Sequence, residues 1–176
     1  MSETAAAHAA DLGISFHDLF RYHADETRRW RQWLERQPPA VLDLPMGAEA
    51  NQEIGTVRAM IFHIFLVEWV YAQILNGEPY DGWSEFKQDS LESIFHVSDV
   101  AQAGFREFLD GATPAALASD ATISGRGMSM TGSRRKFVMH TFLHSARHWA
   151  QLAMVLRQHG RKTDWQHDLV LSDVIK

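Results

Sequence analysis

Residues 133–160 have the sequence SRRKFVMHTFLHSARHWAQLAMVLRQHG, and this stretch decides which fold we expect for the whole chain. Apolar residues recur every three or four positions from Phe137 to Leu156, which is the period of an α-helix. Gly160 is suited to close such a helix. The segment therefore predicts one long helix from about Ser133 to His159.

Three other segments carry the same period, at about 15–37, 56–76 and 90–110. Ser15 can cap the first of them, Pro38 stops it, and Gly77 suits a left-handed cap after the second. Residues 121–131 have the pattern of a short hairpin. We therefore expect an all-α protein, a four-helix bundle with a short hairpin before the last long helix. Residues 1–176 should form one domain, with 1–13 as a flexible N-terminal arm and 163–176 as a C-terminal tail packed on the bundle.

Composition excludes several classes of protein. The 176 residues are 45% hydrophobic and 22% charged, as in ordinary globular domains, so wholesale disorder is excluded. Cysteine is absent, which excludes disulfides and a cysteine nucleophile and fits a reducing compartment. The net charge of −5 argues against nucleic acid and anionic lipid as partners.

The same sequence favours a cytoplasmic protein without a membrane partner. The longest apolar stretch, residues 60–75, is interrupted by His63, Glu68 and Gln73, and we expect it to be too short and too polar to span a bilayer. Residues 1–13 lack the apolar core of a secretory signal.

Histidine is the residue type in which we look for chemistry, because the chain has ten. His140, His144 and His148 recur at intervals of four, so adjacent members share one face of the last helix and two of them can chelate one divalent ion. A third ligand must come from another helix, and His63 in the most apolar helix is the obvious donor. The spacing permits His140 with His144 as readily as His144 with His148.

Two histidines are candidates for a pocket rather than for a metal. His23 is the polar member of the apolar stripe of the first helix. It could face the pocket, as a proton carrier or as a hydrogen-bond partner of a metal ligand, or it could make hydrogen bonds in the core. His140 is the other pocket candidate. Metal sites with carboxylate ligands fit the sequence less well than a histidine site. Glu92 and His96 lack the spacing of a di-iron motif. Glu68 comes five residues after His63, which places it on a different face of the helix.

At two places the sequence resembles DinB/YfiT-like proteins. Residues 57–69, VRAMIFHIFLVEW, followed by Asn76 and Gly77, resemble the second helix of that family. Residues 140–152, HTFLHSARHWAQL, and the ending at Gly160 resemble its closing helix, in which a His-x-x-x-His pair precedes a glutamine. Helix order and loop lengths agree from about 15 to 160.

This resemblance implies an up-down-down-up four-helix bundle, commonly dimeric, which holds one divalent ion. By position, its ligands would be His63, His144 and His148, with His140 one turn earlier. Some members of the family are transferases or isomerases that use low-molecular-weight thiols. The chain departs from the family at Leu143, where asparagine is common, and at Trp149, where arginine is common.

The function that we expect is that of a divalent-metal-dependent enzyme acting on a small molecule, a thiol-dependent S-transferase or isomerase. Imidazole suits zinc, nickel, copper and iron alike, and of these we expect zinc or nickel. The alternative is a metal- or ligand-binding protein without catalysis, with a sensor or sequestering role. We also expect a homodimer, because the last helix is apolar around more of its circumference than one bundle face needs.

Overall fold

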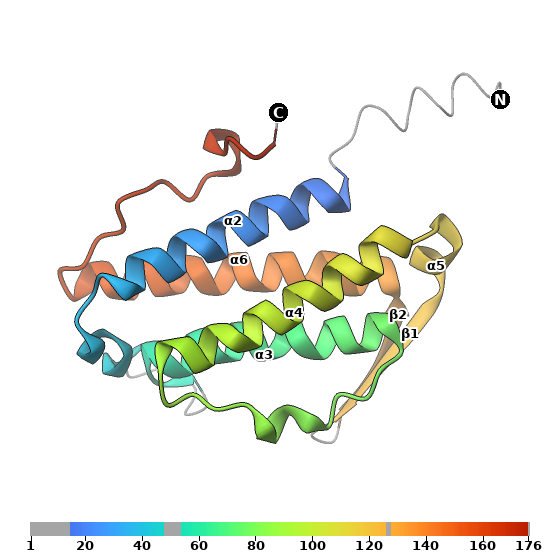
Figure 1. Ribbon diagram of the computed structural model, residues 1–176, viewed down its shortest axis with the longest axis horizontal. Coiled ribbons are helices and arrows are strands. Elements are labelled where there is room, and N and C mark those ends of the chain that lie inside the picture. The colour runs from blue at the N-terminus through green and yellow to red at the C-terminus, as the bar shows by residue number, and fades with distance from the viewer. Residues whose placement is uncertain (1–14, 48–53, 126–127, 176) are drawn as a thin grey trace.

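The computed structural model describes residues 15–47, 54–125 and 128–175, so the expected arm at 1–13 lies outside the described residues. The described chain is mostly helical, with a small two-stranded sheet (Figure 1). Its long helices confirm the helical segments that periodicity predicts; they are α2 (Phe16–Glu35), α3 (Val57–Asn76), α4 (Leu91–Gly111) and α6 (Arg134–Gln158).

The helix ends are fixed by the capping residues in the sequence. The Ser15 hydroxyl accepts a hydrogen bond from the Asp18 amide, and the Asp18 carboxylate accepts one from the Ser15 amide, which makes a capping box. Thr56 caps α3 through the amide of Ala59. Gly77 ends α3 with φ of 78°, a left-handed conformation that favours glycine.

Short elements join the long helices. The hairpin expected at 121–131 is present, with Asp120 paired to Ser133 and Gly125 to Met128. A short helix before it was not expected from the sequence, although Thr113 caps it and Pro114 occupies its first turn. The short elements are η1 (Pro39–Asp43), η3 (Gly82–Glu85), α5 (Pro114–Ala118), β1 (Asp120–Gly125), β2 (Met128–Ser133) and η4 (Leu169–Leu171).

The long helices lie alongside one another, and α3 contacts both α4 and α6, as α2 does. In Figure 1, α3 and α4 run in one direction and α2 and α6 in the other. Because α3 and α4 are parallel, the segment 77–90 has to return along the length of the helices, and Figure 1 shows it doing so through η3. Gly104 allows α3 and α4 to pack closely, because a Cβ atom at this position would lie 3.1 Å from the Cβ of Ala72 and would press the helices apart by a few tenths of an ångström.

An aromatic core joins the C-terminal segment to the helices. The Trp30 side chain is fully buried and stacks on Trp149 of α6, with ring centroids 4.8 Å apart. The Trp30 ring also contacts the rings of Trp165 and His167, from the segment after α6, with centroid distances of 5.2 Å in both cases. Glu26 of α2 accepts hydrogen bonds from the Trp165 indole at 3.1 Å and from the His167 ring at 2.9 Å. These contacts hold the end of the chain against α2.

Helix α3 passes the tests of length and composition for a membrane span, contrary to the sequence-based expectation that its apolar stretch is too short and too polar. Its burial gives the physical reason for this apolar character, because 56% of its most apolar window lies inside the protein, between α4 and α6. This burial fits the core helix of a soluble protein.

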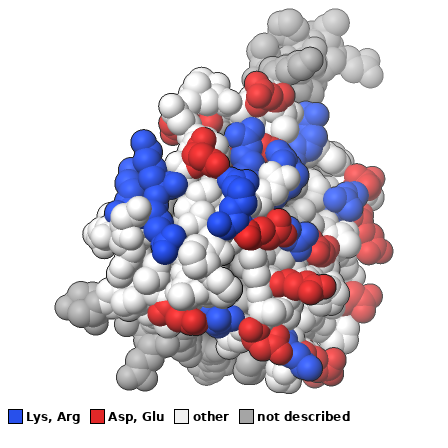
Figure 2. Space-filling view, turned by 60° about the vertical axis from the view of Figure 1, so that its left-hand side comes forward, with Lys and Arg blue, Asp and Glu red and all other residues white. Residues whose placement is uncertain are grey.

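Charged side chains of both signs are mixed on the face that Figure 2 shows. The arginines of α2 have carboxylate partners: Arg28 and Arg29 both bind Asp25, and Arg31 binds Asp99 of α4 at 2.8 Å. Residues 28–33 of α2 have the sequence RRWRQW. Trp30 of this segment lies in the core, and its arginines form ion pairs nearer the surface.

Candidate metal centre

Three histidines from two helices meet between α3 and α6. His63 projects from α3, and His144 and His148 project from neighbouring turns of α6 because four residues make slightly more than one turn. The Nε2 atom of His144 lies 3.2 Å from that of His63 and 3.1 Å from that of His148. The three ligand atoms all lie within 4.8 Å of one another.

The separation of these nitrogens fits one ion held in common. With metal–nitrogen bonds of about 2.0–2.1 Å and a tetrahedral angle, two ligand nitrogens lie about 3.3 Å apart. The two short Nε2 separations are close to that value. His144 and His148 are 8% and 7% exposed, whereas His63 is partly exposed. The group is therefore buried on its α6 side and reaches toward solvent at His63.

Gln151 orients the ring of His148. Its Oε1 atom lies 2.6 Å from Nδ1 of His148, and an amide oxygen only accepts hydrogen bonds, so Nδ1 carries the proton. In the neutral ring, Nε2 then presents its lone pair to the other two histidines. A hydrogen bond of this kind commonly fixes the tautomer of a metal-binding histidine. This role of Gln151 was not predicted from the sequence, although a glutamine three residues after a histidine on a helix is a signal that could have indicated it.

The surroundings keep the histidines of α6 neutral. Burial, followed by the proximity of His148, His63, His140 and Arg147, lowers the pKa of His144 to about 3. Burial also lowers the pKa values of His148 and His140. Neutral imidazole is the form that binds metal ions, so protons compete weakly for these ligands near pH 7. Within the described residues Nδ1 of His144 is buried and has no hydrogen-bond partner.

His140 lies beside this group but outside it. Its ring is 5.7 Å from that of His144 and 5.6 Å from that of Tyr71, and the side chain is exposed. Of the two pairs that the spacing of α6 permits, the structure thus brings His144 and His148 together with His63. Neither His140 nor Glu68 belongs to the group.

His23, the other pocket candidate, lies in the core. Its Nε2 atom is 3.1 Å from Oε1 of Glu68, and the two side chains are 8% and 1% exposed. The hydroxyl of Ser145, the residue after His144, donates to the same oxygen at 2.7 Å. A buried carboxylate needs such partners, and these come from α2 and α6. His23 therefore lies in the core at ion-pair distance from a buried carboxylate. The part of Ser145 could not be seen from the sequence.

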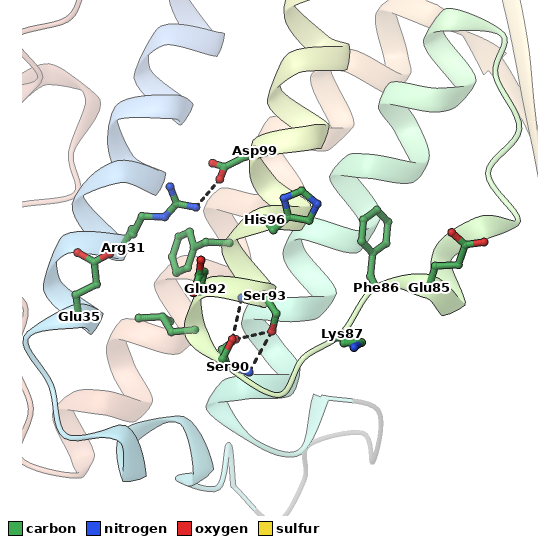
Figure 3. Close-up of a pocket in the computed structure, with 12 residues that line it drawn as sticks. Arg31, Glu35, Glu85, Phe86, Lys87, Ser90, Glu92, Ser93, His96 and Asp99 are labelled. Carbon is green, nitrogen blue, oxygen red and sulfur yellow. Dashed lines mark hydrogen bonds and ion pairs between the residues drawn. The ribbon is translucent and has the colours of Figure 1, made fainter.

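A surface cleft of about 1150 Å³ lies elsewhere, between α2, the segment 85–87 and the start of α4 (Figure 3). Figure 3 shows His96 and Phe86 facing each other across it, and Arg31 paired with Asp99. Glu92 and His96 both line this cleft, but none of the three grouped histidines does.

The fold and the site define a class of helical protein in which two core helices bring three histidines together. The family model described as the DinB family matches residues 1–171, and the chain belongs to that family. No protein of curated function matches the sequence. At the two positions where the sequence departs from the family pattern, Trp149 is buried against Trp30 and Leu143 is 64% exposed.

We expect alanine at His63, His144 or His148 to abolish tight binding of a divalent ion, because two imidazoles hold such an ion poorly. His140→Ala should keep the ion, with affinity reduced by about 10–100-fold at most. Zinc titration calorimetry of the purified variants measures this, with His17→Ala, an exposed histidine of α2, as the control. Loss of metal in His140→Ala together with retention in His148→Ala would contradict the assignment.

Replacing Gln151 with alanine should weaken metal binding by about 10–100-fold, since the His148 ring would lose the bond that fixes its tautomer. Gln151→Glu keeps an acceptor for Nδ1 and should retain the affinity. Gln158→Ala, at the exposed end of the same helix, is the matched control. The same calorimetric titration measures the zinc affinity of these variants. Equal affinities for Gln151→Ala and Gln158→Ala would show that Gln151 does not contribute to metal binding.

Proposed function

We propose that the protein is a divalent-metal-dependent enzyme that acts on a small molecule, as a thiol-dependent S-transferase or isomerase. The observation that carries the proposal is the convergence of three Nε2 atoms, from His63, His144 and His148, with no carboxylate in the group. Three neutral ligands leave the full charge of a dication and an open coordination position, as catalytic zinc sites do. Zinc and nickel are the ions that we expect.

A metal ion bound there would act as a Lewis acid and lower the pKa of a thiol or water that it coordinates. The chain has no cysteine, so the thiol has to be a separate small molecule. In a transfer, the thiol gives its proton to the solvent, its sulfur bonds to an electrophilic carbon, and the leaving group departs with the electron pair of the bond that breaks. In an isomerisation no group leaves: the sulfur adds to one carbon of a double bond, whose π electrons move onto the neighbouring atoms, and after rotation about the resulting single bond the sulfur is expelled with its electron pair as the double bond forms again. His63, His144 and His148 would bind the ion and so orient the thiol that it coordinates. Because His144 and His148 are buried, they limit the access of water to the ion.

The antiparallel directions of α2 and α6 relative to α3 and α4 support an up-down-down-up four-helix bundle of the DinB type. The absence of cysteine and the net charge of −5 support our expectation of a cytoplasmic protein with neither nucleic-acid nor membrane partners.

Purified protein should contain about one divalent ion per chain by elemental analysis, and it should consume a small thiol when an electrophile is present. A colorimetric thiol assay is well suited, because the cysteine-free chain contributes no background. His144→Ala should be inactive. Bound metal without thiol consumption across a panel of electrophiles would favour the sensor or sequestering alternative, and protein without metal after incubation with zinc or nickel would contradict both functions.

Apolar side chains at the surface of α6 support a homodimer. Met139, Leu143 and Met154 are 41%, 64% and 51% exposed on this helix. Light scattering at micromolar concentration should therefore give the mass of a dimer. Leu143→Glu should shift the mass toward the monomer, because it places a charge in the interface, whereas Val170→Glu, at the 88% exposed residue of the C-terminal segment, should not. A monomeric mass for the unmodified protein would refute the dimer.

A further inference from the structure

Two side chains with unused hydrogen-bonding atoms lie next to the three histidines. His140 is one turn before His144 on α6, and Tyr71 is two turns after His63 on α3. Because α3 and α6 are antiparallel, later residues of α3 lie beside earlier residues of α6 (Figure 1). Tyr71 and His140 therefore come together on one side of the group, with ring centroids 5.6 Å apart, and His140 lies 5.7 Å from His144.

The hydroxyl of Tyr71 is free to bind a ligand. The residue is only 6% exposed, yet within the described chain its hydroxyl makes no hydrogen bond, and its contacts are with the rings of Phe137 and His140. The two other tyrosines use their hydroxyls: Tyr22 donates to the carbonyl of His167, and Tyr80 donates to that of Ser124. The Tyr71 hydroxyl is not among the fully buried atoms that lack a partner, so this atom keeps some access to solvent and can be reached by a ligand.

His140, whose side chain is exposed, is the second member of the pair with Tyr71. Its ring makes aromatic contacts with Tyr71 and His144 but no hydrogen bond or ion pair with the residues that the structure describes. A neutral imidazole has one N–H donor, and a phenol has one O–H donor. The two rings that carry these donors lie side by side, with centroids 5.6 Å apart. His140 comes four residues before His144 on α6, which is a rise of about 6 Å along the helix.

We propose that Tyr71 and His140 form a subsite for a carboxylate, or a similar oxygen acceptor, of a ligand whose other end reaches the three histidines. The proposal rests on the proposed function and narrows its thiol to a short mercapto acid. The spacing of about one helical turn suits a sulfur and a carboxylate separated by two carbons. Two donors that converge on one anionic group make the stronger, charge-assisted kind of hydrogen bond.

The test uses protein loaded with cobalt(II), whose absorption spectrum changes when sulfur enters its coordination sphere. It is titrated with 3-mercaptopropionate and with 1-propanethiol, which lacks the carboxylate. The unmodified protein should bind 3-mercaptopropionate more tightly. Tyr71→Phe and His140→Ala should each lower that affinity about tenfold, which is the effect of one hydrogen bond to a charged group, and should leave the affinity for 1-propanethiol unchanged.

Tyr80→Phe and His17→Ala remove the same groups elsewhere and should behave as the unmodified protein does. If the preference for 3-mercaptopropionate survives in both Tyr71→Phe and His140→Ala, or if both thiols lose affinity equally, the subsite is overturned while the metal function stands. If the unmodified protein binds no cobalt, or if neither thiol changes the spectrum, the proposed function fails and the subsite with it. His140→Ala changes an exposed ring, so the test remains decisive if Tyr71→Phe does not fold.

Discussion

The carboxylate of Glu68 lies at the centre of the protein, where one of its oxygens binds both the ring of His23 and the hydroxyl of Ser145. Three helices, α2, α3 and α6, are thereby joined at one buried point. Leaving a buried hydrogen-bonding group without its partner costs about 1–3 kcal/mol, and more when the group is charged. The register of α3 against α6 depends on this contact, since a shift of one helix along the other would break it.

That register places His63 opposite His144. Ser145 and His144 are adjacent on α6, and Glu68 lies five residues after His63 on α3, so the polar contact in the core and the histidine group use different faces of the same two helices. One face supplies the internal hydrogen bonds, and the other presents three imidazoles toward a more open side. The apolar character of α3, which alone would suit a membrane span, follows from its burial between α4 and α6.

The aromatic core around Trp30 supports the turn of α6 that bears His148. Trp149 follows His148 directly and is stacked on Trp30, which also packs against His167 of the C-terminal segment. This explains the departure from the family pattern at Trp149, because the position is filled by a ring of the core rather than by a cation at the site. The ring holds the turn of α6 that bears His148, while Gln151 holds the imidazole itself.

The sequence by itself determined the helices, because period, capping residues and glycine stops act over a few residues; Ser15, Thr56 and Gly77 mark ends that the structure has. It also restricted the candidate metal ligands on α6 to neighbouring members of a four-residue ladder, and it placed Glu68 on a different face of α3 from His63. The tertiary structure decided which pair meets His63, and it revealed Ser145 and His23 as the partners of Glu68. Helical spacing fixes only the face on which a residue lies, whereas the contact between α3 and α6 depends on packing between residues about 80 positions apart.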